Sequence, residues 1–331
     1  MTNLYEWLIQ NKMKMDIKLQ KILLPRELKG EVHFYKASIK SNKEPEFGWG
    51  YSSDKKTALI KACAESVERC IFDHYQYDLL TTNGLAVHST FNDAKHNSIN
   101  ELIERDSFLS HYLTKTPFIS FDNHAVKNNI YKPLKNFALK YGIELHLRKM
   151  SAPSGMHAFV CATYGKNCIL KKYGLLLGLG CDRDENTAIE RALLECAVQV
   201  FFYLSTSIDD ESITLDHFIR KGDQVSLSDH RSLHLNVNYM NHTKKLFSSE
   251  AQEKSVSYEN INISGIEVNQ LPIPENMNGV PVVATHAFFH GSQNLFFQAT
   301  TPEKINLVRL SNFVGKALSF ENIQTFPHPL S

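Results

Sequence analysis

The 331-residue sequence lacks several features that would assign it at once to a common class of protein. Its formal net charge is only +1, so its overall charge gives no reason to expect binding to nucleic acid or to an anionic membrane surface. It contains no apolar run of about eighteen residues, as a transmembrane helix would need. Its first residues have neither a continuous apolar core nor a small-residue cleavage site, so we expect no signal peptide and a cytoplasmic protein.

The usual signatures of metal and nucleotide sites are missing as well. The six cysteines include no C-x-x-C pair and the fifteen histidines no H-E-x-x-H, so the sequence does not predict a zinc site. Gly178-Leu179-Gly180 lacks the third glycine of a dinucleotide fingerprint, and no G-x-x-x-x-G-K-[ST] loop occurs. Any nucleotide site in this chain must therefore be built in another way.

The sequence does contain a pattern that occurs three times, in residues 48–69, 84–105 and 178–199. Aligned on the first glycine, each segment has an alanine at +10 and a glutamate at +17, and the first two add a glutamate at +20. The alanines are Ala58, Ala94 and Ala188, and the glutamates are Glu65, Glu101 and Glu195, with Glu68 and Glu104 at +20. The spacing is too irregular for a solenoid, so we expect three separate helices that carry the same chemical face.

Basic or amide side chains accompany these carboxylates at two further offsets. They are Lys61, Asn97 and Arg191 at +13, and Arg69, Arg105 and Gln199 at +21. Magnesium prefers oxygen ligands and keeps phosphates and waters among them, while arginine binds phosphate oxygens in pairs. The pattern therefore predicts a magnesium–nucleotide site without a P-loop. For any one helix, a solvated amphipathic face or a structural Arg–Glu pair would explain the same residues.

The spacing of apolar residues predicts the elements that carry these motifs. We expect a strand over residues 31–40 and helices over 55–72 and 93–113, then a short strand over 118–121 and a helix from 131 that ends near Gly142. Residues 156–163 and 173–179 are expected to form a hairpin, from which the third motif helix leaves with Asp184 or Asn186 as its cap. Strands over 281–290 and 295–300 and a helix over 304–318 complete the prediction.

The three segments resemble the nucleotide-binding motifs of the YcaO family. Asn83-Gly84-Leu85-Ala86 and residues 101–106 (ELIERD) are similar to its second motif, and residues 191–195 (RALLE) with Gln199 to its third. The sequence ends in Pro327-His328-Pro329-Leu330-Ser331, which is similar to the Pro-x-Pro-x-Pro terminus of azoline-forming members. In two departures, Lys61 replaces a motif serine and Ser331 replaces the last proline.

This resemblance implies the fold and the roles of the site residues. It implies a single compact body of mixed α/β class over residues 30–331, with sheets flanked by helices around a nucleotide cleft, after a lead of residues 1–29. Residues 206–260 are polar and are expected to be an insertion or a partner-facing region. The implied magnesium ligands are Glu65, Glu68, Glu101, Glu104 and Glu195. The implied ATP-binding residues are Lys61, Arg69, Asn97, Arg105, Arg191 and Gln199, with Arg69 alternatively holding Glu65 and Glu68 in place.

The resemblance also implies a reaction. YcaO enzymes use ATP and Mg²⁺ to phosphorylate a backbone amide of a ribosomal precursor peptide, so that a Cys, Ser or Thr side chain closes a thiazoline or oxazoline ring. Glu195, Arg191, Pro327 and Pro329 are the residues expected to matter most for catalysis. We expect the three helices to converge on one cleft, and the proline-rich tail to lie in a groove beside it.

Such enzymes usually work with other proteins. The expected partners are the precursor peptide and a leader-peptide-binding protein related to ubiquitin-activating enzymes. Because only about thirty residues precede the motif region, we expect this protein to be a separate chain. An FMN-dependent azoline dehydrogenase is a further expected partner. Two alternatives stay open: thioamide or amidine formation by the same family, and a scaffold that binds nucleotide or precursor without catalysis.

Overall fold

The computed structural model describes most of the chain. The chain divides into two compact units. The described residues are 4–11, 16–24, 32–39, 45–75, 82–122, 126, 128–165, 173–205, 213–248, 259–277 and 279–330. Unit 1 comprises Met1–Leu102 and Gly265–Phe289, and unit 2 comprises Ile103–Ser264 and His290–Ser331. Helix α3 (Phe91–Leu113) begins in unit 1 and ends in unit 2.

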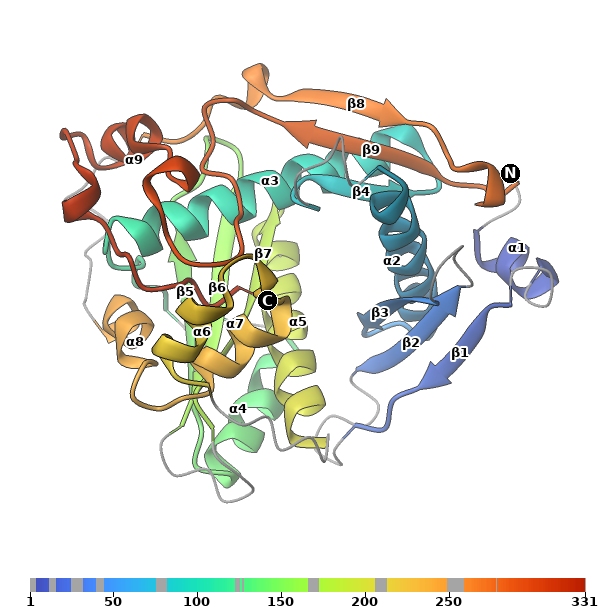
Figure 1. Ribbon diagram of the computed structural model, residues 1–331. Coiled ribbons are helices and arrows are strands. Elements are labelled where there is room, and N and C mark those ends of the chain that lie inside the picture. Colours follow the sequence, from blue (N-terminus) through green and yellow to red (C-terminus); the bar gives the residue numbers. More distant parts are fainter. Residues whose placement is uncertain are drawn as a thin grey trace. The chain divides into compact units, whose positions relative to one another are not determined.

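Unit 1 contains two antiparallel sheets of three strands each (Figure 1). The first has the order β1 (Lys18–Lys21), β2 (His33–Ile39), β3 (Glu46–Ser52). The second has the order β4 (Leu85–His88), β9 (Val283–Phe288), β8 (Glu267–Leu271). Helices α1 (Leu4–Asn11) and α2 (Lys55–Tyr75) accompany them, and α2 packs on β3 and β2.

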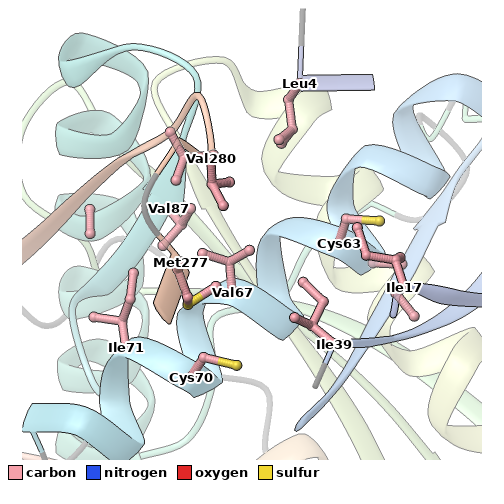
Figure 2. Close-up of a cluster of buried hydrophobic side chains, with 14 of the residues drawn as sticks. Leu4, Ile17, Ile39, Cys63, Val67, Cys70, Ile71, Val87, Met277 and Val280 are labelled. Carbon is pink, nitrogen blue, oxygen red and sulfur yellow. The ribbon is translucent and has the colours of Figure 1, made fainter. Parts of the chain in front are cut away.

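The core of unit 1 lies between α2 and the segments around it. Val67 and Ile71 of α2 contribute to it, together with Ile39 of β2 and Val87 of β4 (Figure 2). Leu4 of the short helix α1 is also buried there. This apolar stripe of α2 leaves the carboxylates of the first motif on other faces of the helix, as the sequence pattern requires.

Unit 2 is built on the antiparallel sheet β5 (Glu144–Met150), β6 (His157–Tyr164), β7 (Leu175–Asp182), on which α5 (Glu185–Ser205) packs (Figure 1). Its other helices are α4 (Tyr131–Lys140), α6 (Leu215–Lys221), α7 (Leu227–His234), α8 (Asn241–Ser248) and α9 (Leu307–Val314). Strand β7 is buried along its whole length, which explains why its sequence is a nearly continuous apolar run. Short 3₁₀ turns occur at Gly222–Gln224, Ile263–Gly265, Glu275–Met277, Pro302–Lys304 and Phe320–Asn322.

Most predicted elements are confirmed, and the misses have physical causes. The helices over 55–72 and 93–113 and the hairpin before the third motif all occur. The strand predicted over 118–121 is only a single bridge between Ile119 and Lys149, and residues 295–300 form no strand. Leu295 and Phe296 are buried all the same, so their apolar character reflects packing rather than a sheet. Within the described residues, no helix is both long and apolar enough to cross a membrane.

Candidate functional site

The first and third motifs are the same strand–helix device, β3–α2 in unit 1 and β7–α5 in unit 2. In each, a strand carrying Gly-x-Gly passes directly over the helix that follows it. A Cβ added to Gly50 would lie 1.9 Å from the Ala58 carbonyl oxygen, and one added to Gly180 would lie 2.1 Å from that of Ala188. Any side chain would overlap the helix backbone, so glycine is required for this close approach.

The helix of each device begins at the same offset. Asp54 and Asp184 each accept a hydrogen bond from the backbone N–H three residues on, at 2.7 and 2.8 Å, which confirms Asp184 as a cap. Thr90 does the same for α3, accepting from the Asp93 N–H at 3.2 Å. The sequence alignment therefore holds for all three helices. Gly84 is different, because it adopts φ +77° just before β4 and packs against Ala287.

The glutamates at +17 are fixed by the strands. Glu65 Oε2 accepts from the Trp49 N–H at 2.7 Å, and Glu195 Oε2 accepts from the Leu179 N–H at 2.6 Å. Trp49 and Leu179 are the middle residues of the two Gly-x-Gly sequences, and each lies on a strand at the end of its sheet. One carboxylate oxygen is thus used to hold the strand, so the direction of the other is set by the fold.

Three carboxylates gather in unit 1, those of Glu65, Glu68 and Glu101. Burial raises the pKa of Glu68 well above its ordinary value, and the charges of Glu101 and Glu65 raise it further, while Arg69 opposes them. Arg69 donates to Glu65 Oε1 at 2.8 Å, as expected of a residue that holds this carboxylate. Such an acid cluster favours a bound cation, because neighbouring carboxylates do not all ionise easily without one.

The cluster does not form a complete cage for a metal. Among the residues that the structure describes, no three His, Cys, Asp or Glu side chains converge closely enough to hold an ion by themselves. Magnesium ordinarily takes one or two carboxylates and fills its octahedron with waters and substrate phosphates. The donors present therefore fit Mg²⁺ that arrives together with a phosphate ligand, with Glu65, Glu68 and Glu101 as the residues that would hold it.

Unit 2 contains a pocket that brings together four of the predicted site residues, Arg105, Glu195, Gln199 and Pro329. The start of β7, Leu330 of the tail, and Arg231 of α7 also line it. The sequence pattern did not predict Arg231 in this pocket, because its place in the lining depends on contacts between segments far apart in the chain. The pocket combines guanidinium, carboxylate and amide groups, which are the donors and acceptors that a metal-bound phosphate needs.

The other predicted residues do not line this pocket. Arg191 forms an ion pair with Asp182 of β7 at 3.2 Å, and the buried Glu104 lies 3.6 Å from Arg105 of the pocket. Lys61 is exposed, with its Nζ 5.6 Å from the centre of the Tyr51 ring. Asn97 is half-buried on α3. Because Glu65 and Glu195 belong to different units, the convergence of the three helices on one cleft stays a prediction.

The proline-rich tail is buried in unit 2. The Pro327 carbonyl accepts from the Tyr112 hydroxyl at 2.9 Å and lies 2.8 Å from His234 Nε2, and the His328 carbonyl lies 3.0 Å from His230 Nδ1. Phe326 and Leu330, the two expected anchors, are both buried. Ser331 lies outside the described residues. Tyr112 and the α7 histidines thus hold the tail by its backbone carbonyls, so Pro329 and Leu330 are fixed in the wall of the pocket.

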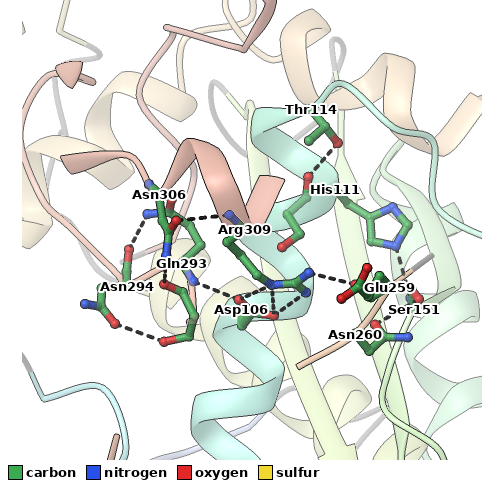
Figure 3. A network of polar contacts seen from close by, with 12 residues as sticks. Asp106, His111, Thr114, Ser151, Glu259, Asn260, Gln293, Asn294, Asn306 and Arg309 are labelled. Atoms are coloured by element: carbon green, nitrogen blue, oxygen red, sulfur yellow. Dashed lines mark hydrogen bonds and ion pairs between the residues drawn. The ribbon is translucent and has the colours of Figure 1, made fainter. Parts of the chain in front are cut away.

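A buried network supports the second half of α3. Asp106, the last residue of the second motif, faces Arg309 of α9 with Oδ2 and Nη2 2.7 Å apart, and also accepts from the Gln293 N–H at 2.8 Å (Figure 3). Arg309 donates in addition to the Glu259 carbonyl at 2.7 Å. Asp106 therefore anchors the second half of α3 to α9 and to the segment at Gln293, contacts that the motif alone did not predict.

The fold and these residues define a class: an α/β protein without a P-loop motif, in which repeated strand–helix segments carry carboxylate and guanidinium groups. The family model described as YcaO cyclodehydratase, ATP- and Mg²⁺-binding, matches residues 73–262, more than half of the chain. The chain belongs to the YcaO family. The predicted enzyme class and the predicted use of ATP and Mg²⁺ are thereby confirmed. No curated protein matches the sequence.

Solved structures have the same fold at low sequence identity. A heterocyclase in complex with substrate and cofactor matches 99% of this chain with a TM-score of 0.69 at 14% identity, and the chain spans 57% of its length. YcaO from Methanopyrus kandleri, bound with AMPPCP and Mg²⁺, matches at 0.56 and 13% identity, covering 88% of this chain and 90% of that one. The E. coli microcin synthetase McbBCD complex with pro-MccB17 matches at 0.52 and 15%, covering 91% and 95%. The mixed α/β fold class is therefore confirmed.

Proposed function

We propose that this protein is an ATP- and Mg²⁺-dependent cyclodehydratase that converts Cys, Ser or Thr residues of a ribosomal precursor peptide into thiazoline or oxazoline rings. The observation that carries the proposal is the repeated strand–helix device. The same Gly-x-Gly and glutamate arrangement carries a carboxylate cluster in unit 1 and lines a pocket with Arg105 in unit 2. A metal-bound polyphosphate requires both kinds of group, carboxylates for the metal and guanidinium groups for the phosphate oxygens.

The reaction needs phosphate because an amide oxygen is a very poor leaving group. The side-chain thiol or hydroxyl attacks the preceding carbonyl carbon and loses its proton, and the carbonyl oxygen then takes the γ-phosphoryl group of ATP. The C–O bond breaks as inorganic phosphate leaves, the amide nitrogen loses its proton, and a C=N bond completes the ring. Mg²⁺, when bound, neutralises charge on the phosphates during this transfer.

The chain's own residues bind and orient these groups. Glu65, Glu68 and Glu101 hold the metal, with Glu65 kept in place by the Trp49 N–H and Arg69. Glu104 and Glu195 contribute further carboxylates from unit 2. Lys61, Asn97, Arg191 and Gln199 are proposed partners of the nucleotide, alongside Arg105. Their contribution is placement and electrostatic stabilisation of developing charge, which are the main sources of catalysis in phosphoryl transfer.

Two further proteins belong to the proposal. A separate leader-peptide-binding protein related to ubiquitin-activating enzymes would deliver the precursor. An FMN-dependent dehydrogenase would oxidise the azoline product to an azole. Pro327 and Pro329 support the reaction through the tail, whose buried position beside Arg105 and Glu195 favours a role in shaping the site.

The test is reconstitution of the reaction with the precursor peptide and leader-binding protein encoded beside the gene. We expect loss of one water from the peptide for each ring, with release of one ADP and one phosphate for each water lost. Mass spectrometry and a phosphate assay measure the two quantities. Oxygen-to-sulfur exchange upon addition of sulfide would instead identify thioamide formation. Nucleotide binding without any change in the peptide, with all components present, would favour a scaffold.

A further inference from the structure

Arg231 is the one basic residue in the lining of the unit 2 pocket that lies outside the three repeated segments. It comes from α7, in the polar region 206–260 that the sequence left without a role. The other polar side chains of the lining are Arg105, Glu195 and Gln199, all of them in the motifs. The pocket therefore has a second guanidinium group that the motif pattern does not account for.

The structure holds Arg231 in place from several sides. Its guanidinium carbon lies 5.6 Å from the centre of the Phe202 ring of α5, and the arginine is half-buried. Helix α7 starts with a capping box between Ser226 and Asp229, and Asp229 also contacts Lys221. His230, next to Arg231, and His234 lie against carbonyls of the tail. A guanidinium group that lies over an aromatic ring on a capped helix loses little freedom when it binds a ligand.

The charges in the pocket indicate the kind of ligand. Two arginines and one glutamate line the pocket; one oxygen of that glutamate, Glu195 Oε2, already accepts from the Leu179 N–H, and Arg105 lies 3.6 Å from Glu104. A bare anion would meet Arg105 and Arg231 but also Glu195. An anion that brings its own divalent cation satisfies all three, because the cation binds the carboxylate and the phosphate oxygens bind the arginines.

We propose that Arg231 and Arg105 together bind the terminal phosphates of the Mg²⁺-bound nucleoside triphosphate, in a pocket whose wall is completed by Pro329 and Leu330. The inference rests on the proposed use of ATP and names a further binding residue for it. It also explains why the tail is buried here: α7 carries both the arginine that binds the phosphate and the histidines that contact the tail. The polar region 206–260 thus contributes to the nucleotide site.

The experiment measures binding of two nucleotides to the full chain by calorimetry in the presence of Mg²⁺. AMPPNP carries the triphosphate, and AMP carries only the first phosphate. The variants are Arg231→Gln, Arg231→Lys and, as a matched control, Arg220→Gln, which removes the same charge from an exposed pair with Asp216 on α6. We expect Arg231→Gln to weaken AMPPNP binding by roughly ten- to a hundredfold, the range of a lost charge-assisted hydrogen-bonding group, and to leave AMP unchanged.

The other outcomes separate this inference from the proposed function. Arg231→Lys should bind AMPPNP with intermediate affinity, because it keeps the charge but not the paired donors, and Arg220→Gln should match the unaltered protein. Unchanged AMPPNP binding by Arg231→Gln overturns the inference alone. An equal loss for AMP and AMPPNP, with a lower melting temperature, also overturns it and assigns Arg231 to the fold. Failure of the unaltered protein to bind AMPPNP overturns the proposed function itself.

Discussion

The devices β3–α2 and β7–α5 share a backbone arrangement but differ in the chemistry they carry. In both, Gly-x-Gly lies against an alanine of the helix, an aspartate caps the helix, and the glutamate at +17 accepts from the middle N–H of the strand. The glycines even pair alike in their sheets, since Gly50 is opposite Tyr35 and Gly180 opposite Phe159. The shared backbone fixes one carboxylate in each unit.

The difference lies one turn further along each helix. In α2 the residues at +20 and +21 are Glu68 and Arg69, and the cluster with Glu101 is acidic. In α5 the same offsets hold Val198 and Gln199, and the neighbouring pocket contains Arg105 and Arg231. The same backbone arrangement therefore stands beside an acidic cluster in one unit and beside a pocket with two guanidinium groups in the other. In our proposal, the side chains next to the fixed glutamate decide whether the surface mainly binds metal or mainly binds phosphate.

The largest effect is expected from removing the charge of the shared glutamate. Glu65→Gln and Glu195→Gln should each lower the rate of ATP-dependent cyclisation by roughly a hundred- to a thousandfold, because a preorganised electrostatic contact to the metal or phosphate is lost. Glutamine keeps a carbonyl oxygen for the Trp49 or Leu179 N–H, so the fold should remain intact. Phosphate release with precursor present measures the rate, and circular dichroism checks the fold.

The control for this pair is Glu185→Gln, which changes a glutamate that pairs with His157 at 3.4 Å at the start of α5 and does not line the pocket. It should retain nearly the full rate. If Glu65→Gln abolishes the reaction while Glu195→Gln cyclises normally, the two glutamates are equivalent in structure only, and the assignment of Glu195 to the site is wrong.

The next effect concerns stability and tests whether the two backbones are equivalent. Gly50→Ala and Gly180→Ala should each lower the free energy of unfolding by about 3 kcal/mol or more, because the new Cβ would overlap a helix carbonyl. Gly155→Ala is the control, since Gly155 has φ +78° with no atom within 4 Å of the added Cβ, and it should cost only about 1 kcal/mol. Urea denaturation measures all three. Tolerance of alanine at Gly180 alone would show that the β7–α5 contact is looser than its counterpart.

The comparison also shows what the sequence could predict. The offsets of Glu65 and Glu195 were visible because both the helix repeat and the glycine contacts are local in sequence. Arg231 was not visible, because it reaches the pocket only through the packing of α7 against the tail, which involves residues about a hundred positions apart. Asp106 stood within a recognised motif, but its partner Arg309 lies 203 residues away. The apolar run at Leu295 and Phe296 predicts a strand that does not form, because burial alone also produces such a run.

A third prediction distinguishes the tail of unit 2 from helix α2 of unit 1 by their response to acid. In unit 2, burial lowers the pKa of His230 to about 4 and that of His234 to about 3, and lowers the pKa of His328 well below its ordinary value. At His230 the contact with the His328 carbonyl and the charge of Asp229 oppose this shift of the pKa, while Lys304 adds to it. At His328 the neighbouring His230, His234 and Arg105 add to the lowering of the pKa, and the contact with the Phe296 carbonyl opposes it. His230 Nε2 accepts from the Gln298 N–H at 3.0 Å, so this ring must be neutral and protonated on Nδ1.

The direction in which stability changes with pH follows from proton uptake. Below the ordinary histidine pKa of about 6.5, the unfolded chain binds protons that the folded tail region does not, so stability falls as the pH drops from about 6.5 to about 4, by up to roughly 1.4 kcal/mol per pH unit for each histidine. Glu68 in unit 1 affects stability in the opposite direction as the pH falls, because its raised pKa makes the folded state the better proton acceptor. Hydrogen exchange at pH 7 and pH 5, corrected for intrinsic rates, should show residues 326–330 losing protection while α2 does not. Equal protection of the tail at both pH values would contradict the prediction.

The smallest effect is expected at +13, where the two devices carry Lys61 and Arg191. Lys61 is exposed above Tyr51, whereas Arg191 is half-buried and paired with Asp182 at 3.2 Å.

An exposed charge near a phosphate contributes on the order of 0.2–1 kcal/mol, so Lys61→Ser should raise the KM for ATP by at most about fivefold. Lys61→Glu should raise it more, because it adds repulsion, and Arg191→Ser should exceed Lys61→Ser because it also leaves Asp182 without its ion pair. Steady-state kinetics at several ATP concentrations give the three values. If the unaltered protein, Lys61→Ser and Lys61→Glu share one KM, this lysine is a surface residue, and the two devices differ at +13 in function as well as in exposure.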